Sequence, residues 1–345
     1  MSDEKTKIET KIETEIEPKS PIIQKKNCKS KTMILSTKSG EYFADLLLEK
    51  LGTDNFEKVE MDRKQFAGGE EYYRIGVDKK SDLLDKTVIF VSSTAYDGDF
   101  LELVRVGMAL SGYGTRRRIF VIPFMGYSTM ERATKSGEVV TCKTNCRILS
   151  SIPKDGEGNI FFLFDLHVSG IVHYFESTIA FEVYGEQILA EGVRKLNLEP
   201  GTFMFASADL GRTAWVSSYS KKFNNTPVAF VRKTRKMEET EVHEVIGEVK
   251  GMHVIIYDDM IRSGGTLFHA VDAYLNNGAL SIYTVISHFA ITSEAVCQKL
   301  IDSKITKIIT TNSHPMSQIK LVKESDKFII VDASIPFAKA IRNYF

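Results

Sequence analysis

The sequence predicts an α/β protein with two domains, each an open, mainly parallel sheet flanked by helices. Three observations support this fold class. The chain has 345 residues, enough for about two domains of typical size. From Thr32 onward, apolar runs of strand length alternate with segments of helical periodicity, as expected of successive βαβ units. Several of the strand-like runs end in charged or Gly-rich segments, which is where such sheets bind their ligands.

Residues 1–31 come before the alternating region and are predicted to form a disordered, charged tail. Ile recurs every four residues within Lys7–Glu17, but high charge without aromatic residues favours disorder over a stable helix. The predicted strands that follow are 32–36, 70–76, 87–92, 118–123, 159–165, 202–206, 228–231, 252–257, 280–287, 305–310 and 327–331. The predicted helices are 41–51, 97–112, 139–150, 182–195, 211–223, 265–277, 292–302 and 334–344.

A domain boundary is predicted near residues 175–180. It separates an N-terminal domain, 32–178, from a C-terminal domain, 179–345, whose last helix is expected to pack on the N-terminal domain. Lys+Arg and Asp+Glu both number 45, so no overall charge points to nucleic acid or to an anionic membrane. No apolar run approaches the roughly 20 residues that span a bilayer, and the N-terminus has no apolar signal segment.

The four cysteines show no spacing typical of a disulfide framework. Cys142 and Cys146 lie four residues apart on a predicted helix, without a matching cluster of histidines nearby. A metal or redox pair is one interpretation, and two buried core cysteines are the favoured one. A reducing, cytoplasmic location fits this use of cysteine.

The segment Val254–Leu267 carries the strongest functional pattern in the chain. An apolar run, Val254–Tyr257, reads as a buried strand and ends in Asp258 and Asp259. A loop with Ser263, Gly264, Gly265 and Thr266 follows, and then a helical pattern begins. The start of a helix offers free N–H groups and a positive dipole to a phosphate, and paired acids suit sugar hydroxyls or Mg²⁺.

A tight turn and a solvated strand end would account for the glycines and the acids separately. The fixed order of strand, acid pair, Ser/Thr and helix favours the phosphate site. The segment resembles the PRPP-binding fingerprint of two families, the type I phosphoribosyltransferases and the ribose-phosphate diphosphokinases (PRPP synthetases). The latter resemblance covers roughly residues 32–345, because further motifs stand in the expected order.

Two of these motifs resemble ATP-binding segments of the PRPP synthetases. Phe66-Ala-Gly-Gly-Glu70 resembles a Phe-Ser-Asp-Gly-Glu segment that reaches adenine across a subunit interface, although Gly68 replaces the usual acid. Taken alone, this segment would be read as a hairpin turn. Ile122–Arg132 resembles a loop near ATP and keeps Glu131 and Arg132, while Thr129 and Met130 replace an Arg-Gln pair. A solvated loop cation is the alternative interpretation of Arg132.

Two further motifs resemble the part of these enzymes that holds metal and phosphates. Phe164–Ser169 contains the Asp-Leu-His segment, in which His167 would lie beside the metal and ATP phosphates. Asp165 is predicted to share the strand face of His167, and it joins Glu176 as a weaker metal ligand. Asp209 resembles an acid that faces a metal, and it is equally suited to cap the helix that follows.

The basic cluster Arg232–Lys236 follows the predicted strand 228–231. It resembles the flexible catalytic loop, whose Lys-x-Arg pair corresponds to Lys233 and Arg235. Cations that close over a transferring pyrophosphoryl group would stabilise its charge. Without this context, the cluster would be read as a solvated turn.

The resemblance implies two type I phosphoribosyltransferase-like domains and the reaction ATP + ribose 5-phosphate → PRPP + AMP, with Mg²⁺ as cofactor. The implied catalytic residues are Lys233, Arg235 and His167. The implied ribose 5-phosphate residues are Asp258, Asp259, Arg262 and Ser263–Thr266. The residues assigned to ATP are Phe66, Gly68, Glu70, Glu131 and Arg132, and those assigned to metal are His167, Asp209, Asp165 and Glu176.

The shared adenine site implies a homo-oligomer. No nucleic acid or membrane partner is expected. Ser-Gly-Gly-Thr at 263–266 and Gly137-Glu138 look like the plant-type class II enzymes, so weak phosphate dependence and weak ADP inhibition are expected. Two alternatives stay open. One is a non-catalytic regulatory subunit, suggested by the altered residues Gly68, Thr129 and Met130. The other is a phosphoribosyltransferase that consumes PRPP, although such enzymes usually need only one such domain.

Overall fold

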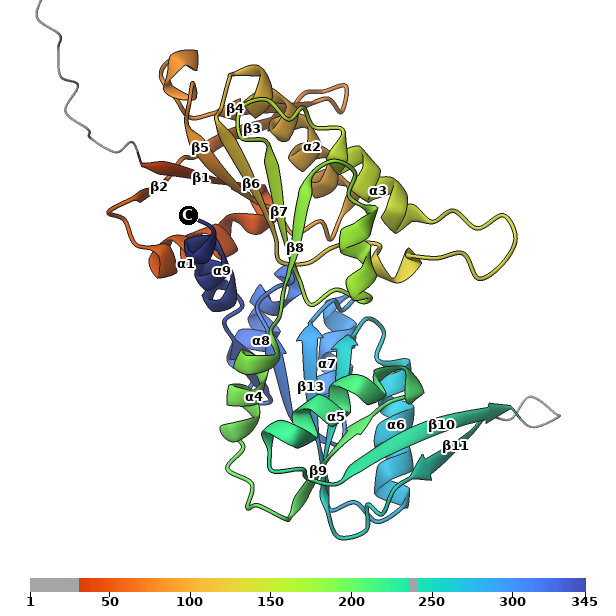
Figure 1. The fold of residues 1–345 in the computed structure, drawn as a ribbon. Helices are drawn as coiled ribbons and strands as arrows, with labels where there is room; N and C mark the ends of the chain where they lie inside the picture. Colours follow the sequence, from red (N-terminus) through yellow and green to blue (C-terminus); the bar gives the residue numbers. More distant parts are fainter. Residues whose placement is uncertain (1–30, 236–240) are drawn as a thin grey trace, which may run out of the picture. The chain divides into compact units, whose positions relative to one another are not determined.

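The structure is a computed structural model that describes residues 31–235 and 241–345 (Figure 1). The predicted tail, 1–31, therefore lies outside the described residues except for Lys31. Two large sheets and one separate hairpin account for the strands that are described. Within the described ranges, no helix is both long enough and apolar enough to cross a membrane.

The first sheet is parallel throughout and has the strand order β2-β1-β5-β6-β7-β8. Its strands are β1 (Thr32–Ser36), β2 (Phe56–Lys58), β5 (Thr87–Val91), β6 (Arg117–Ile122), β7 (Asn159–Phe164) and β8 (Ile179–Val183). The helices of this part are α1 (Glu41–Leu51), α2 (Asp97–Gly112) and α3 (Thr141–Ser150). The inner strands β5 and β7 are buried along their whole length, because the helices of βαβ crossovers cover both faces of such a sheet.

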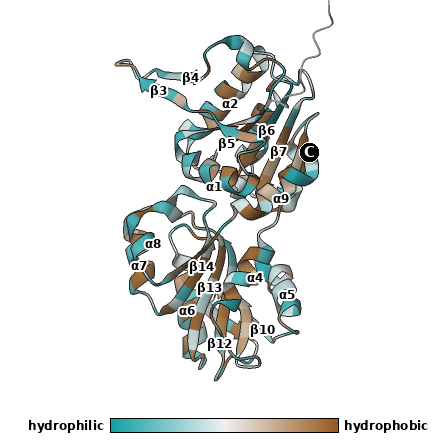
Figure 2. Ribbon diagram, turned by 90° about the vertical axis from the view of Figure 1, so that its left-hand side faces the viewer, coloured by the Kyte–Doolittle hydropathy of each residue, from teal (hydrophilic) through white to brown (hydrophobic). Residues whose placement is uncertain are grey.

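The second sheet has the order β11-β10-β9-β12-β13-β14-β15, and only the β10–β11 pair is antiparallel. Its strands are β9 (Phe203–Ser207), β10 (Val228–Arg235), β11 (Glu241–Ile246), β12 (His253–Met260), β13 (Ser281–His288), β14 (Ile305–Thr311) and β15 (Phe328–Val331). The accompanying helices are α4 (Glu186–Arg194), α5 (Thr213–Lys222), α6 (Gly265–Asn276), α7 (Glu294–Asp302) and α8 (Lys320–Glu324). Figure 2 shows the apolar residues concentrated in the strands of both sheets.

The predicted α/β class is confirmed, and most elements lie where the apolar pattern placed them. Helices α1 and α2 have the predicted bounds, 41–51 and 97–112. The pattern missed β2, β3 (Met61–Gln65), β8, β11 and α8. The missed strand β3 alternates poorly because its residues after Met61 are polar and largely exposed. The missed strand β8 pairs with β7, so the first sheet continues to Val183.

Helix α9 (Ser334–Tyr344) follows the second sheet but packs on α1, which belongs to the first part of the chain. The Phe337 ring lies 5.6 Å from the Phe43 ring in an edge-on contact, and both side chains are fully buried. The Tyr42 hydroxyl on α1 also donates to the backbone oxygen of Asn312, 2.8 Å away, just after β14. The two sheets therefore share one hydrophobic cluster around these helices.

A second buried contact joins the end of β13 to the segments that follow β6 and β14. The Phe124 ring lies edge-on to the imidazole of His288 at 5.1 Å and to that of His314 at 4.6 Å. Burial lowers the pKa of His314 to about 3, so a neutral ring packs here. The Ser93 hydroxyl donates to the Ser313 backbone oxygen at 2.9 Å. These residues form a buried joint between the two sheets, called the aromatic joint below.

Candidate active site

A cavity of about 550 Å³ lies at the carboxyl ends of β7, β9 and β12. Many of the predicted functional residues line it: Glu131, Arg132, His167, Asp209, Asp258, Asp259, Arg262, Ser263, Gly264, Gly265 and Thr266. They come from several segments that together span more than a hundred positions of the sequence. Parallel sheets bring such residues together because their strands end at one edge.

The loop before α6 forms one wall of this cavity. Gly264 has φ 81°, in the left-handed region, and a Cβ atom there would come 2.8 Å from the Phe268 ring. Glycine meets both conditions because it has no Cβ atom. The loop turns directly into α6, whose first N–H groups lack partners within the helix and face the loop side. This wall has the character of an anion-binding helix start.

The acid pair lies at the end of β12, beside that loop. Burial raises the pKa of Asp258, and the adjacent charge of Asp259 raises it further. Burial alone would also raise the pKa of Asp259, but the hydrogen bond from His167 and the charge of Arg212 outweigh it and lower this pKa to about 2. Asp259 is thus held as a carboxylate, while Asp258 is the more exposed and more easily protonated partner.

His167 reaches Asp259 from the segment after β7, in the other sheet. Its Nδ1 lies 2.7 Å from Oδ2 of Asp259 and also 2.7 Å from Nη2 of Arg212. An Nδ1–H would donate to the carboxylate, whereas a bare Nδ1 would accept from the guanidinium, so the two contacts belong to different tautomers. Nη2 of Arg212 lies 2.6 Å from Oδ1 of Asp259, and Nη1 donates to the His167 backbone oxygen at 3.2 Å.

Sequence reasoning missed Arg212, the residue with the most contacts in this group. It ends the short 3₁₀ helix η5 (Leu210–Arg212) and directly precedes α5. Its spacing from Asp209 in the sequence could have revealed it. A side chain three residues after a strand-end acid lies on the same side of a helical turn.

The other wall of the cavity comes from the loop after β6. The Arg262 guanidinium donates to the Thr129 hydroxyl at 3.1 Å, so the loop before α6 and this loop meet directly. Glu131 is buried, and its Oε1 lies 3.4 Å from Nε of Arg132, whose side chain is 77% exposed. Arg132 borders the cavity and leaves most of its guanidinium accessible to an anionic ligand.

Two predicted metal ligands do not reach the cavity. The strand ends at Phe164, and Asp165 takes φ 38°, so the predicted alternation does not continue to His167. The Asp165 carboxylate turns into the protein, where Oδ1 accepts from the Gly185 N–H and Oδ2 from the Ser287 hydroxyl. Burial raises its pKa to about 7. Glu176 is exposed and pairs with Arg147 at 2.7 Å.

Asp209 lines the cavity but is engaged as a helix cap. Its Oδ1 accepts from the Gly211 N–H at 2.7 Å, as expected of the residue before η5. No group of three or more His, Cys, Asp or Glu side chains among the described residues is arranged to hold a metal ion. The predicted set His167, Asp209, Asp165 and Glu176 therefore does not form one Mg²⁺ site made of protein ligands alone.

The segment predicted to contact adenine lies elsewhere in the chain's structure. Phe66, Gly68 and Glu70 are exposed in the turn between β3 and β4 (Glu71–Ile75), and none of them lines the cavity. The Phe66 ring packs edge-on against Tyr72 at 6.0 Å. Arg63, on β3, anchors the hairpin through an ion pair with the buried Glu102 at 2.8 Å.

The basic cluster is a strand rather than the predicted loop up to Arg235. β10 continues past residue 231, and Lys233 and Arg235 pair with His243 and Glu241 of β11. β-branched residues on both strands suit this hairpin. The side chains of Lys233 and Arg235, and all of Lys236, lie outside the described residues.

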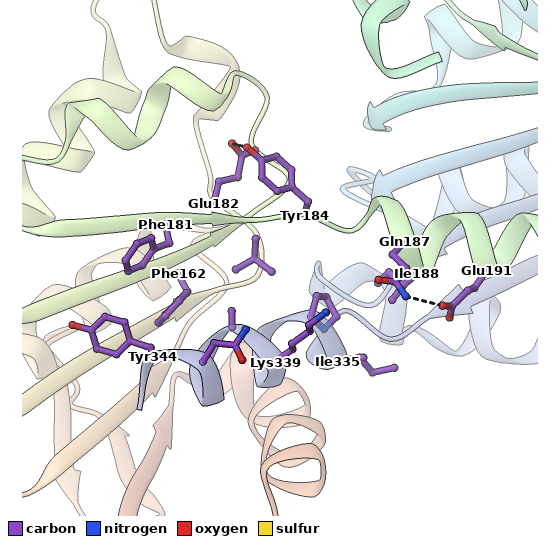
Figure 3. A pocket seen from close by; sticks show the side chains of 14 residues that line it. Phe162, Phe181, Glu182, Tyr184, Gln187, Ile188, Glu191, Ile335, Lys339 and Tyr344 are labelled. Atoms are coloured by element: carbon purple, nitrogen blue, oxygen red, sulfur yellow. Dashed lines mark hydrogen bonds between the residues drawn. The ribbon is translucent and has the colours of Figure 1, made fainter. Parts of the chain in front are cut away.

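A second cavity, of about 600 Å³, lies between β8, α4 and α9 (Figure 3). Its walls are mainly apolar and include Phe162, Phe181 and Tyr344. Glu182 and Glu191 also line it, and Lys339 is its one lysine or arginine. Two carboxylates against one cation disfavour a phosphorylated ligand, so the cavity at the strand ends is the better candidate for one.

The comparisons with known proteins concern both halves of the chain. Residues 32–152 match the family described as the N-terminal domain of ribose phosphate pyrophosphokinase. Residues 218–345 match the family described as the phosphoribosyl synthetase-associated domain. The fold resembles that of phosphoribosylpyrophosphate synthetase from Mycobacterium smegmatis, with a TM-score of 0.79 and 21% identity over 92% of this chain and 99% of that one.

Curated relatives match along most of the chain. A ribose-phosphate pyrophosphokinase of Nostoc sp. is 30% identical over 270 residues, 78% of this chain and 77% of the relative. One from Clostridium tetani is 27% identical and spans 91% of this chain and 96% of its own length. Ribose-phosphate pyrophosphokinase 1, chloroplastic, from Oryza sativa is 25% identical over 87% of this chain and 74% of that protein.

Proposed function

Because the chain belongs to the ribose-phosphate pyrophosphokinase family, we infer that it transfers the β,γ-diphosphoryl group of ATP to the 1-hydroxyl of ribose 5-phosphate. The products are PRPP and AMP, and PRPP feeds nucleotide biosynthesis. The observation that carries this proposal is the cavity, which combines a helix start suited to an anion, an acid pair and cationic side chains from both halves of the chain.

The sugar side of the reaction is assigned to the β12–α6 segment. Ser263–Thr266 would hold the 5-phosphate at the start of α6, where N–H groups and the helix dipole favour an anion. Asp258 would accept hydrogen bonds from the 2- and 3-hydroxyls, with Asp259 behind it. Arg262 would add a positive charge beside the phosphate. Together these groups orient the 1-hydroxyl towards the β-phosphorus, and orientation is a large source of rate.

The nucleotide side is assigned to groups from the first sheet and from β10. His167, Glu131 and Arg132 border the same cavity. Lys233 and Arg235 would neutralise charge on the transferring group and on the departing AMP. The 1-hydroxyl oxygen forms a bond to the β-phosphorus as the bond from this phosphorus to the α-phosphate oxygen breaks. The hydroxyl proton leaves to solvent or to a nearby base.

Mg²⁺ is implied by the family resemblance, and we propose that it enters with the ATP phosphates. In such sites Mg²⁺ usually keeps several waters and takes one or two carboxylates besides substrate phosphates. This agrees with the scattered positions of Asp165, Asp209 and Glu176, which do not make a cage.

A homo-oligomer is also proposed, because the Phe66 segment is exposed and lies apart from the cavity of its own chain. Mixing Phe66→Ala with Lys233→Ala tests this. If Phe66 serves the neighbour's site, the mixture regains activity that neither variant has alone. No recovery after unfolding and refolding the two together would contradict a shared site.

A reducing, cytoplasmic location is supported by Cys142, Cys146 and Cys297, which are buried free thiols. The plant-type class II character stays a prediction, and phosphate titration tests it below.

The decisive experiment for the reaction is AMP formation by the purified protein. AMP should appear from ATP only when ribose 5-phosphate and Mg²⁺ are present, together with equimolar PRPP. A protein that binds both substrates without turnover would be a regulatory subunit. PRPP-dependent consumption of a purine or pyrimidine base would identify a phosphoribosyltransferase instead.

A further inference from the structure

Arg212 belongs to none of the motifs that predicted the site residues. Its side chain is only 14% exposed, although it borders the cavity. It extends from the end of η5, in the second sheet's half, to His167, which follows a strand of the first sheet. A guanidinium is planar and permanently charged, and it can donate in several fixed directions at once.

Arg212 and His167 each engage one carboxylate oxygen of Asp259. Oδ1 of Asp259 lies 2.6 Å from Nη2 of Arg212, and Oδ2 lies 2.7 Å from Nδ1 of His167. Asp259 is therefore committed within the protein. Asp258 is further from the guanidinium, with 3.7 Å between Oδ1 and Nε, and its side chain is 26% exposed. The acid pair is thus divided into one carboxylate that faces inward and one that remains accessible.

The positive charge at this point has a clear electrostatic effect. Two adjacent, partly buried carboxylates repel each other, and they would also repel a sugar phosphate that enters the same cavity. Arg212 offsets this repulsion from a fixed position. It also restrains the segment that carries His167, because Nη1 donates to the backbone oxygen of that residue at 3.2 Å.

The family resemblance implies a metal ion beside His167, but the described side chains do not converge on one. The group found among His167, Asp258 and Asp259 is the Arg212 guanidinium. We propose that Arg212 is a positioning residue. It holds His167 and Asp259 in place across the cavity and supplies, as a fixed cation, the charge that a protein-bound metal ion would otherwise supply there.

This inference rests on the proposed function for its substrate, ribose 5-phosphate. It leads to a specific expectation. The protein should bind ribose 5-phosphate without any divalent cation, because Arg212 already neutralises the acid pair. Without the guanidinium, binding should come to depend on Mg²⁺.

The test compares Arg212→Gln and Arg212→Lys with a control, Arg194→Gln. Arg194 also lies in the second half of the chain, but its guanidinium stacks 5.0 Å from the centre of the Phe223 ring and does not line the active-site cavity. Calorimetry measures ribose 5-phosphate binding with EDTA and with Mg²⁺. Initial rates at fixed MgATP give the free Mg²⁺ concentration for half-maximal activity. Thermal unfolding of each protein shows whether it is folded.

Arg212→Gln should weaken metal-free binding about tenfold or more, the size expected when hydrogen bonds from a charged group are lost. Saturating Mg²⁺ should restore most of the affinity, and the free Mg²⁺ requirement should rise by a similar factor. Arg212→Lys should recover part of the metal-free binding, and Arg194→Gln should match the wild type. If Arg212→Gln does not fold, Arg212→Lys should still show a smaller loss of metal-free affinity and a smaller rise in the free Mg²⁺ requirement.

Unchanged metal-free affinity and unchanged Mg²⁺ requirement in Arg212→Gln would overturn the inference. So would equal losses in the Gln and Lys variants that Mg²⁺ does not relieve, because these would indicate general structural support. Wild-type protein that binds ribose 5-phosphate but forms no AMP would refute the reaction and leave the role of Arg212 standing. Wild-type protein that binds no ribose 5-phosphate under either condition would refute both.

Discussion

Nδ1 of His167 lies 2.7 Å from Oδ2 of Asp259, although His167 follows a strand of the first sheet and Asp259 lies near the end of a strand of the second. His167 belongs to the half assigned to ATP, and Asp259 belongs to the half assigned to the sugar. The contact places the two halves of the proposed reaction within hydrogen-bond distance of each other.

Lys233→Ala should lower kcat by about two to three orders of magnitude, because a cation that stabilises transition-state charge is lost. Folding should change little, since the substitution leaves the strand pairing of β10 in place. Steady-state AMP formation and thermal unfolding measure the two effects. Lys323→Ala is the matched control, because Lys323 is exposed on α8 and does not line the cavity. Near-full activity of Lys233→Ala would show that the assigned role is wrong.

Gly264→Ala should raise KM for ribose 5-phosphate, because Gly264 has φ 81° and a Cβ atom would press on Phe268 beside the phosphate loop. Gly201→Ala is the control, since Gly201 has φ 85° and nothing within 4 Å of a Cβ atom. Both variants should lose about 1–3 kcal/mol of unfolding free energy through backbone strain. Only Gly264→Ala should change KM. An equal effect of both variants on KM would argue against a phosphate cradle at this loop.

The contribution of Asp259 to stability should depend on pH. Its pKa is lowered from 3.8 to about 2 in the folded protein, so ionisation favours folding. The contribution, about 2 kcal/mol from this shift, is present above pH 4 or so and is lost as the pH falls towards 2. The contribution of Asp258 to stability changes with pH in the opposite direction, because its pKa is raised. Comparing wild type with Asp259→Asn separates the contribution of Asp259 from that of Asp258.

Denaturant unfolding at a series of pH values checks this prediction. The difference in unfolding free energy between wild type and Asp259→Asn should narrow as the pH falls from about 5 towards 3. Asp326→Asn provides the reference, because the Asp326 side chain is fully exposed. A difference that stays constant over this range would show that His167 and Arg212 do not hold Asp259 ionised.

Phe337→Ala should destabilise the protein by about 3–5 kcal/mol, the usual cost of emptying a buried aromatic site. The ring is fully buried and contacts Phe43 on α1, so the cavity would open between α9 and α1. Ile335→Ala, two residues away on the same helix and 47% exposed, should cost much less. Urea unfolding of both variants gives the comparison. Similar losses would mean that α9 is not anchored through Phe337.

Initial rates should depend only weakly on inorganic phosphate, and ADP should inhibit mainly by competing with ATP. This follows from the predicted plant-type class II character, because Gly137 and Glu138 cannot supply a cation for a regulatory anion. Glu138 accepts hydrogen bonds from the N–H groups of Thr134 and Lys135, which leaves a negative charge in this loop. A phosphate titration at saturating substrates measures the effect. Strict dependence on phosphate would place the protein with the regulated class I enzymes.

Much of the fold follows from local pattern, because the inner strands of parallel sheets are continuous apolar runs. β1, α1 and α2 could be bounded in this way. β2 and β11 could not, since edge strands are short or polar and owe their structure to a partner strand. The extension of β10 to Arg235 likewise depends on β11.

The composition of the cavity was largely predictable, but the connections within it were not. Asp258, Asp259 and the Ser263–Thr266 loop could be found because they are contiguous. Asp165 could not be oriented, because a backbone φ of 38° follows from tertiary packing and reverses the expected alternation. Arg212 shows the same limit, since its partners His167 and Asp259 are distant in sequence and meet only when both sheets are in place.

The aromatic joint limits how the two sheets can move around the active-site cavity. Rotating one sheet against the other would separate Phe124 from His288 and His314 and would break the hydrogen bond from Ser93 to Ser313. All five residues are buried, so such a rotation would expose their apolar and polar surface with nothing to replace the contacts. The spacing between the loop after β6 and the loop before α6 is therefore set when the chain folds. The width of the cavity is therefore fixed before substrates bind, and only its exposed side chains can adjust to them.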